Sequence, residues 1–144
     1  MGYQMTQSDG RAKCAQDSDA ATPEDSTVTE FLHLPRPRNL VENQFYIALN
    51  GIYSTDVHFW LDMSEVLPIT GDRRWVYNDG SPVPWSHWHP NEPNNAGNEE
   101  HSVQMGVGGM WNDINNRHMQ TSICTYHLPA GAEEICPWLQ DFVP

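Results

Sequence analysis

The chain has 144 residues, which suits one domain with one core. Nineteen acidic residues against seven Lys and Arg give a net charge of −12, which repels phosphate backbones and anionic membrane surfaces. Nucleic acid is therefore disfavoured as a partner and a cation is favoured. No stretch approaches the roughly 20 apolar residues that span a bilayer, so we expect no membrane insertion. The first residues lack the apolar run of a signal peptide, which leaves secretion open.

The N-terminal third predicts a short strand and two helices. Gly2 to Met5 reads as the strand, and Ser8 to Asp17 as the first helix. A second helix is predicted over residues 22–34, where Thr22 supplies an N-cap hydroxyl and apolar side chains recur at i, i+3 and i+4. It should end at Leu34, because two prolines follow and remove backbone donors.

The rest of the chain predicts short strands around one long loop. Gln44 to Asn50 is a nearly continuous apolar run and reads as a buried strand, while the mixed residues 56–72 read as a loop. A strand over Arg74 to Asn78 should end in a tight turn at Asn78-Asp79-Gly80. Residues 81–98 are crowded with Pro, Asn and Gly and predict a long structured loop. Further strands are predicted at 101–105 and 121–127, so the expected fold class is α+β.

Three cysteines, Cys14, Cys124 and Cys136, show no C-x-x-C spacing, which disfavours a zinc knuckle or a redox dithiol. One disulfide plus one spare thiol is the simplest interpretation, and three pairings are possible. In a secreted protein the odd cysteine indicates a bond to another chain or a free thiol.

Five residues with side-chain oxygens stand at suggestive spacings in and after the long loop: Glu92, Asn94, Glu100, Asn112 and Asp113. Carboxylate and amide oxygens are the ligands that Ca²⁺ prefers, in sets of about 6 to 8. The three carboxylates would repel one another if gathered without a cation. Spacing alone leaves the ordinary interpretation open, in which these residues are solvated loop side chains.

Several motifs, in order, resemble those of the C-type lectin domain between about Tyr3 and Tyr126. Tyr46-Ile47-Ala48-Leu49 resembles the family's Trp-Ile-Gly-Leu strand, and Trp88 with Glu92-Pro93-Asn94 resembles its long-loop motif. Trp111-Asn112-Asp113 is similar to its Trp-Asn-Asp strand, and Ile123-Cys124-Thr125-Tyr126 to its closing strand. The expected fold has two helices flanking small antiparallel sheets with a long structured loop. The domain is expected over residues 1–128, with a tail over 129–144 in subunit contact.

The resemblance implies a carbohydrate-binding role for the five oxygen donors. Glu92, Asn94, Glu100, Asn112 and Asp113 would bind the principal Ca²⁺, with Pro93 in a cis bond, and two vicinal sugar hydroxyls would complete the coordination. The order Glu92 before Asn94 resembles the mannose type, which implies mannose or N-acetylglucosamine as the terminal sugar. An aromatic wall from Trp85, His87 or His89 would turn the sugar and allow N-acetylgalactosamine.

The resemblance also implies a disulfide between Cys14 and Cys124. The family's inner disulfide is absent, because Ser102 and Asn116 stand at its two positions. Cys136 is then left over, for an intersubunit bond in a homo-oligomer or as a buried thiol. We interpret Trp75, Trp88 and Trp111 as core, and His87 and His89 as loop residues in preference to transition-metal ligands. A second calcium site would draw on Asp62, Glu65, Asp72 and Asn95.

These expectations describe a secreted, calcium-dependent lectin for terminal sugars, with a role in innate immune recognition of microbes. The alternative is a lectin-like domain that binds acetamido sugars or a protein partner without direct calcium coordination. An enzyme is not expected, because a glycosidase needs a carboxylic acid whose pKa is raised by apolar burial, and these carboxylates stand among polar residues.

Overall fold

The computed structural model describes residues 4–21 and 31–126. Two helices and six strands follow one another along these residues, with two short 3₁₀ turns, Ala96–Asn98 and Val107–Gly109, between strands. The helices are α1 (Gln7–Ala21) and α2 (Leu40–Tyr53). The strands are β1 (Gln4–Met5), β2 (Phe59–Glu65), β3 (Trp75–Tyr77), β4 (Glu100–Met105), β5 (Trp111–Asn115) and β6 (Gln120–Thr121). The expected α+β class is confirmed.

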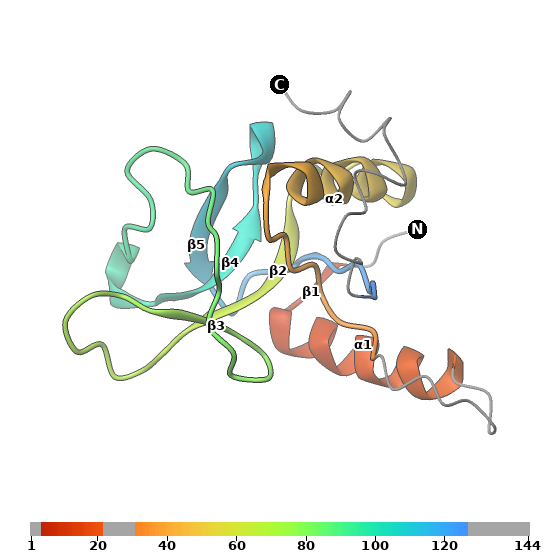
Figure 1. The fold of residues 1–144 in the computed structure, drawn as a ribbon, viewed down its shortest axis with the longest axis horizontal. Coiled ribbons are helices and arrows are strands. Elements are labelled where there is room, and N and C mark those ends of the chain that lie inside the picture. The colour runs from red at the N-terminus through yellow and green to blue at the C-terminus, as the bar shows by residue number, and fades with distance from the viewer. Residues whose placement is uncertain (1–3, 22–30, 127–144) are drawn as a thin grey trace.

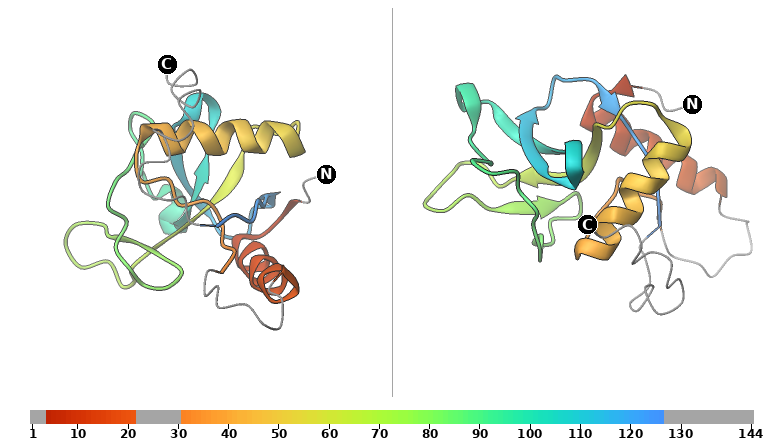
Figure 2. Two further views of the ribbon diagram at one scale, coloured as in Figure 1. Left: turned by 45° about the vertical axis from the view of Figure 1, so that its right-hand side comes forward. Right: turned by 90° about the horizontal axis from the view of Figure 1, so that it is seen from above.

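The strands form one mixed sheet in the order β1-β6-β2-β4-β5, with β3 also paired to β2. The β2–β6 pairing is parallel and the other pairings are antiparallel, so the expectation of purely antiparallel sheets was wrong in this detail. In Figure 1 the two helices lie on one side of the molecule, and the loops around β3 extend on the other. Figure 2 shows the same separation from above. The long loop is therefore free of helical cover.

Strand β2 divides the core into two halves. Phe59, Leu61 and Met63 are fully buried in the larger apolar cluster, which includes Tyr46 of α2. Trp60, between them in sequence, packs with Cys14 of α1 in a second cluster. Successive side chains of a strand point to opposite faces, so one strand supplies both clusters.

Two predicted elements were wrong around α2 and β2. Residues 44–50, predicted as a strand, lie in α2, so Tyr46-Ile47-Ala48-Leu49 is helical and its proposed likeness to a family strand does not hold. The helix begins at Leu40, because the side chain of Asn39 caps it and accepts a hydrogen bond from Glu42 N at 2.9 Å. Residues 56–72, predicted as a loop, contain β2.

The acidic residue that made β2 look like a loop is neutralised inside the fold. Asp62 is fully buried and accepts hydrogen bonds from Arg11 of α1 at 2.7 Å and from Arg36 at 2.8 Å. A buried carboxylate is tolerated in a strand when it is paired in this way. Hydrophobic periodicity cannot anticipate such partners, because they lie 51 and 26 residues away.

The other elements agree with the prediction to different degrees. The helix predicted over 8–17 is present and longer, and the strands at 74–78 and 101–105 are confirmed as β3 and β4. The turn at Asn78-Asp79-Gly80 is present, with Gly80 at φ +87°. Of the predicted helix 22–34, residues 31–34 are not helical, and 22–30 lie outside the described residues. The strand predicted at 121–127 is short, ending at Thr121 in β6, with a separate bridge from Thr125 to His33.

A disulfide joins Cys14 of α1 to Cys124, across 110 residues of chain, as the resemblance implied. It fastens α1 to the segment that follows β6, and both sulfur-bearing residues belong to the second core cluster or pack against it. Cys136 and the tail 129–144 lie outside the described residues. Among the helices described, none is long and apolar enough to cross a membrane.

Candidate metal centre

The long loop between β3 and β4 is fastened to the start of β5 by backbone hydrogen bonds. Trp111 N donates to His87 O at 2.7 Å, and His89 N donates to Trp111 O at 2.9 Å. This bridge carries the loop past β5, so that Glu92 and Asn94 follow next to Asp113. The Glu92-Pro93 peptide is cis, as expected.

Asp113 is the buried centre of the site. Its side chain is fully buried, and its Oδ1 accepts from Asn94 N at 3.0 Å. Its Oδ2 accepts from Asn95 N at 2.7 Å and from Arg73 Nη1 at 2.9 Å. Burial favours the neutral acid, but the hydrogen bonds from Glu92, Arg73 and the two amides outweigh it and lower the pKa of Asp113. Asp113 is thus a fixed, ionised oxygen donor beneath the loop.

Glu92 has the opposite tendency. Burial, followed by the hydrogen bond to Asp113 and its negative charge, raises the pKa of Glu92 to about 7. We expected these carboxylates to lack such a shift, so that expectation was wrong for Glu92. Two carboxyl groups in contact cannot both carry charge at low cost unless a cation lies between or beside them.

Glu100 and Asn94 meet on one backbone amide. Ala96 N donates to Glu100 Oε1 at 2.7 Å and to Asn94 Oδ1 at 3.2 Å. Glu92 Oε2 in turn accepts from Asn94 N at 3.2 Å. Hydrogen bonds therefore connect four of the five predicted donors.

Asn112 is the donor that these contacts do not reach. It lies beside Asp113 on β5 and is half-buried, opposite Gln104 of β4. Within the described chain, no hydrogen bond joins its side chain to the other four donors. Successive side chains of a strand point to opposite faces, so the side chain of Asn112 points away from that of Asp113. The assignment of Asn112 to the donor set therefore rests on the family resemblance alone.

The donor set matches the chemistry of Ca²⁺, since it offers three carboxylates and two amides, all hard oxygens. The described His, Cys, Asp and Glu side chains contain no cluster of three already set to hold a metal ion. Binding an ion here would therefore need the amide oxygens as ligands. The side chains of Glu92 and Glu100 would also have to rotate away from the backbone N–H groups of Asn94 and Ala96, from which they accept hydrogen bonds. Asn94 is exposed and Glu92 and Glu100 are half-buried, so the donors face solvent.

Arg73 is a residue of this network that the sequence analysis missed. Its Nε and Nη2 donate to the Glu65 carboxylate at 2.6 and 2.7 Å, and Nη2 also donates to Glu100 O at 2.8 Å. With Nη1 on Asp113, one guanidinium joins β2, β4 and β5 beneath the loop. It is one of two adjacent arginines in an acidic chain, and no periodic pattern marks such a residue.

Two of the residues proposed for a second calcium site already have cationic partners. Asp62 is bound by Arg11 and Arg36, whereas Glu65 is bound by Arg73 and also accepts from His101 Nδ1 at 2.9 Å. The two carboxylates are therefore already paired with separate cations. A guanidinium stands where that second ion would need Glu65.

The tryptophans divide between core and surface. Trp111 is fully buried and its Nε1 donates to Asn43 Oδ1 at 2.8 Å, so its assignment to the core is confirmed. Trp75 and Trp88, also assigned to the core, are half-buried: they pack against the larger core cluster, with ring centroids 5.1 Å apart, and also reach the surface. His87 stacks on Trp85 at 5.6 Å, nearly parallel. That stack is available as the aromatic wall expected from the sequence.

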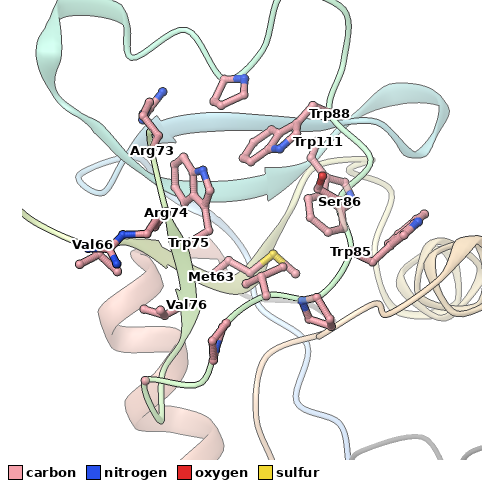
Figure 3. Close-up of a pocket in the computed structure, with 15 residues that line it drawn as sticks. Met63, Val66, Arg73, Arg74, Trp75, Val76, Trp85, Ser86, Trp88 and Trp111 are labelled. Carbon is pink, nitrogen blue, oxygen red and sulfur yellow. The ribbon is translucent and has the colours of Figure 1, made fainter. Parts of the chain in front are cut away.

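Next to these rings lies a cleft of about 730 Å³, which we call the aromatic cleft. Trp75, Trp85, Trp88 and Trp111 line it, with Arg74 and Pro93 also on its wall. Figure 3 shows Trp75 and Trp88 next to each other, with Trp85 extending away from them on the right. Pro93 belongs to both the cleft wall and the Glu92-Pro93-Asn94 segment. The cleft and the oxygen cluster are thus contiguous.

The model of the Lectin C-type domain family matches residues 3–126. This chain belongs to the C-type lectin domain family. Relatives include the mouse low affinity immunoglobulin epsilon Fc receptor, 44% identical over 54 residues, and human C-type lectin domain family 17, member A, 38% identical over 84 residues. Those matches cover 38% and 58% of this chain but only 15% and 20% of the relatives.

Solved structures confirm the C-type lectin fold. The C-type lectin CEL-I from Cucumaria echinata superposes with a TM-score of 0.69 and 21% identity, covering 88% of this chain and 86% of that one. The cow CD23 carbohydrate-recognition domain, solved in the presence of GlcNAc2Man3 oligosaccharide, gives 0.63 and 22%, covering 90% and 84%. A calcium-independent type II antifreeze protein gives 0.60 and 24%, covering 85% and 79%. At these identities the likeness shows the fold alone.

Proposed function

We propose that this C-type lectin domain binds terminal sugars through a calcium ion held by Glu92, Asn94, Glu100, Asn112 and Asp113. The observation that carries the proposal is the meeting of two carboxyl groups on one backbone amide: Glu92 Oε2 and Asp113 Oδ1 both accept from Asn94 N, at 3.2 and 3.0 Å. Burial, and then the hydrogen bond to Asp113 and its charge, raise the pKa of Glu92 to about 7. A divalent cation removes the repulsion that this contact creates. When bound, the ion would offer coordination positions to two vicinal sugar hydroxyls.

Each residue has a distinct part in this proposal. Asp113, fixed by Arg73 and two backbone amides, supplies a preorganised donor. Glu92 and Glu100 are half-buried and their carboxylates turn to the ion, while the exposed Asn94 amide can donate to a sugar oxygen as well as offer its own oxygen to the metal. The Glu92 and Asn94 order favours mannose or N-acetylglucosamine, and the Trp85 and His87 stack keeps N-acetylgalactosamine among the sugars to test.

Binding is favoured over catalysis by the same contact. A glycosidase holds its two carboxyl groups about 5 to 9.5 Å apart, so that the scissile bond and water fit between them. Glu92 Oε2 and Asp113 Oδ1 instead accept from one donor, Asn94 N, at 3.2 and 3.0 Å, and a backbone amide stands between them where the scissile bond would have to lie. The pKa of Glu92 is raised first by burial and then by the neighbouring Asp113. In this proposal a bound cation stabilises the ionised form, so we do not assign Glu92 to an acid catalyst.

The proposal includes an extracellular setting. Disulfides such as Cys14–Cys124 form and persist in oxidising compartments. Recognition of microbial surfaces in innate immunity and a homo-oligomer linked through Cys136 stay predictions, the latter because Cys136 lies outside the described residues. The chain matches only part of its curated relatives, so these properties belong to whatever full protein carries the domain.

Retention on mannose, N-acetylglucosamine and N-acetylgalactosamine resins tests the function. With calcium we expect retention on at least one resin and release by a chelator. Glu92→Gln should abolish retention, whereas the exposed Glu99→Gln, outside the donor set, should not. Retention that ignores the chelator would favour the alternative, a lectin-like domain that binds sugar or protein without calcium, as the calcium-independent antifreeze neighbour makes reasonable.

A further inference from the structure

A second cleft lies between the C-terminal half of α2 and the turn at residues 106–109, which joins β4 to β5, and we call it the α2 groove. Its volume is about 490 Å³, within the range of small-molecule sites, about 300 to 1,000 Å³. Figure 1 shows this turn beside α2, away from the loops around β3. Because a strand rises by about 3.3 Å per residue, the turn begins on the order of 20 Å from Glu100, at the other end of β4.

Apolar side chains reach the α2 groove from both sides. Ile47 of α2 and Val57 line it on the helix side, and Val107 lines it on the turn. Val57 is 53% exposed and Val107 is 69% exposed, so both present apolar surface to solvent. A ligand with an aliphatic body would remove this surface from water.

Gly51 keeps the α2 groove open on the helix side. It lies inside α2, where glycine is less favourable than alanine. Apart from its own helix and chain neighbours, no described atom would lie within 4 Å of a Cβ built at Gly51. By contrast, a Cβ at Gly109 would lie 2.7 Å from Ile47 Cδ1, so packing requires glycine there. The space over Gly51 is therefore free for a ligand.

Asn50 on the wall of the α2 groove has an acceptor in need of a donor. The residue is 4% exposed, and its Oδ1 accepts no hydrogen bond within the described part of the chain. Its Nδ2 donates to Asp56 O at 2.7 Å, which orients the amide and brings the two residues together. A buried acceptor without a partner is costly, so this oxygen favours a ligand that donates a hydrogen bond.

Asp56 is the one charged side chain among the described residues that line the α2 groove. Its Oδ2 accepts from Gln4 Nε2 at 3.0 Å, and its Oδ1 accepts from His58 N at 3.0 Å, with His58 Nδ1 at 3.3 Å. A carboxylate accepts about four hydrogen bonds, so one position is left. The hydrogen bond from His58 N lowers the pKa of Asp56, which keeps it ionised at neutral pH. A 34% exposed carboxylate without a base on the lining favours a cation.

We propose that the α2 groove binds a small primary amine in its ammonium form, with one charged head and an aliphatic body. The ammonium donates to Asn50 Oδ1 and to the Asp56 carboxylate, and the aliphatic chain lies over Gly51, between Val57 and Val107. An ammonium head has three donors and no acceptor, which matches polar groups that accept. This site is separate from the candidate metal centre and does not depend on the proposed function.

The test titrates three probes that share one aliphatic chain: n-hexylammonium, 1-hexanol and hexanoate. At pH 8 an alkylamine, like a Lys side chain, is protonated. Backbone amide chemical shifts, followed by NMR, report both the affinity and the place of binding. We expect n-hexylammonium to bind roughly fivefold more tightly than hexanol, as for a partly exposed charge pair, and hexanoate not to bind. The shifts should concentrate at Gly51, Val57 and Val107.

Variants assign the binding to the α2 groove. Gly51→Leu fills the open space and favours helix, so it should remove binding while the fold is kept. Asp56→Asn should bring the ammonium-to-alcohol ratio to about one. Asp79→Asn, which changes an exposed carboxylate in the turn after β3, should keep the wild-type ratio. Near-ultraviolet circular dichroism verifies that each variant is folded.

Three results would overturn the proposal. Equal affinities of n-hexylammonium and hexanol in the wild type would mean that the carboxylate does not recognise the charge. Binding that survives Gly51→Leu in a folded variant, or shifts that concentrate in the long loop, would place the site elsewhere. A capped lysine peptide that binds more tightly than n-hexylammonium would assign the α2 groove to a protein partner in place of a small amine.

Discussion

The guanidinium of Arg73 bridges Glu65 on β2 and Asp113 on β5, with its nitrogens 2.6 to 2.9 Å from their carboxylate oxygens. Both carboxylate side chains are fully buried, and the arginine is 19% exposed. A fixed internal cation therefore sits beneath the donor set and orients one of its members. The loop that carries Glu92 and Asn94 is held from below by this bridge, because Asp113 accepts from the amides of Asn94 and Asn95.

Replacing Arg73 should destabilise the fold. Arg73→Gln leaves two buried carboxylates without their cation, and breaking a buried pair costs about 3 to 5 kcal/mol. Urea denaturation followed by tryptophan fluorescence measures the loss. Arg117→Gln, which removes an arginine that is 74% exposed and paired with Glu99, should leave the midpoint unchanged. Equal effects of the two variants would mean that the Arg73 bridge adds no stability.

The same bridge predicts a pH dependence of stability. The pKa of Glu65 is lowered, because the hydrogen bonds from Arg73 and His101 outweigh burial. A lowered folded-state pKa gives stability that is present above the unfolded value, about 4.3, and is lost as the pH falls through the folded value. The difference in unfolding free energy between the wild type and Glu65→Gln should therefore shrink below about pH 4.3. A constant difference from pH 7 to pH 3 would contradict this.

A buried amide positions Trp111. Asn43 of α2 is fully buried, donates through Nδ2 to Gly109 O at 2.8 Å and accepts from Trp111 Nε1 at 2.8 Å. Asn43→Ala leaves both groups without a partner, and each unsatisfied buried group costs about 1 to 3 kcal/mol, so we expect a loss of roughly 2 to 4 kcal/mol. Thermal and urea melts measure it, with the exposed Asn116→Ala as the matched control. A midpoint shift no larger than that of the control would refute the role of this amide.

The disulfide should be the largest single covalent contribution to stability. Closing a loop of about 110 residues restricts the unfolded chain by about 4 to 5 kcal/mol in the loop-entropy model. The double variant Cys14→Ala with Cys124→Ala should lose most of that free energy in urea. Because α1 lies on the other side of the molecule from the loops around β3 (Figure 1), calcium affinity should change little. A large fall in calcium affinity at temperatures where the variant is folded would show that α1 supports the site directly.

The sequence could name the candidate donor residues but not the hydrogen-bond network around them. Glu92, Asn94, Glu100 and Asp113 became candidates through the family resemblance, and the structure joins them by hydrogen bonds. Arg73 carries no motif, since its partners lie 8 and 40 residues away in other strands. Long-range pairing of this kind is invisible to local patterns.

The misassigned elements around α2 and β2 share one physical cause. The apolar run at 44–50 has strand length, but the cap at Asn39 decides for helix, and the buried face of α2 includes polar residues such as Glu42 and Asn43. Conversely, Asp62 made β2 look solvated although two arginines neutralise it. In both places buried polar residues with distant partners defeated periodicity, which assumes that buried positions are apolar.

The central claim is that the sugar binds by coordinating the calcium ion, and one measurement tests it most directly. Calcium is titrated calorimetrically into the protein with and without a saturating methyl glycoside of the sugar that the resins retain. Because coupling is reciprocal, a sugar that coordinates the ion must tighten calcium binding by the same factor by which calcium tightens sugar binding. We predict equal factors, lost in Glu92→Gln. A calcium affinity that is the same with and without bound sugar would contradict direct coordination by the ion.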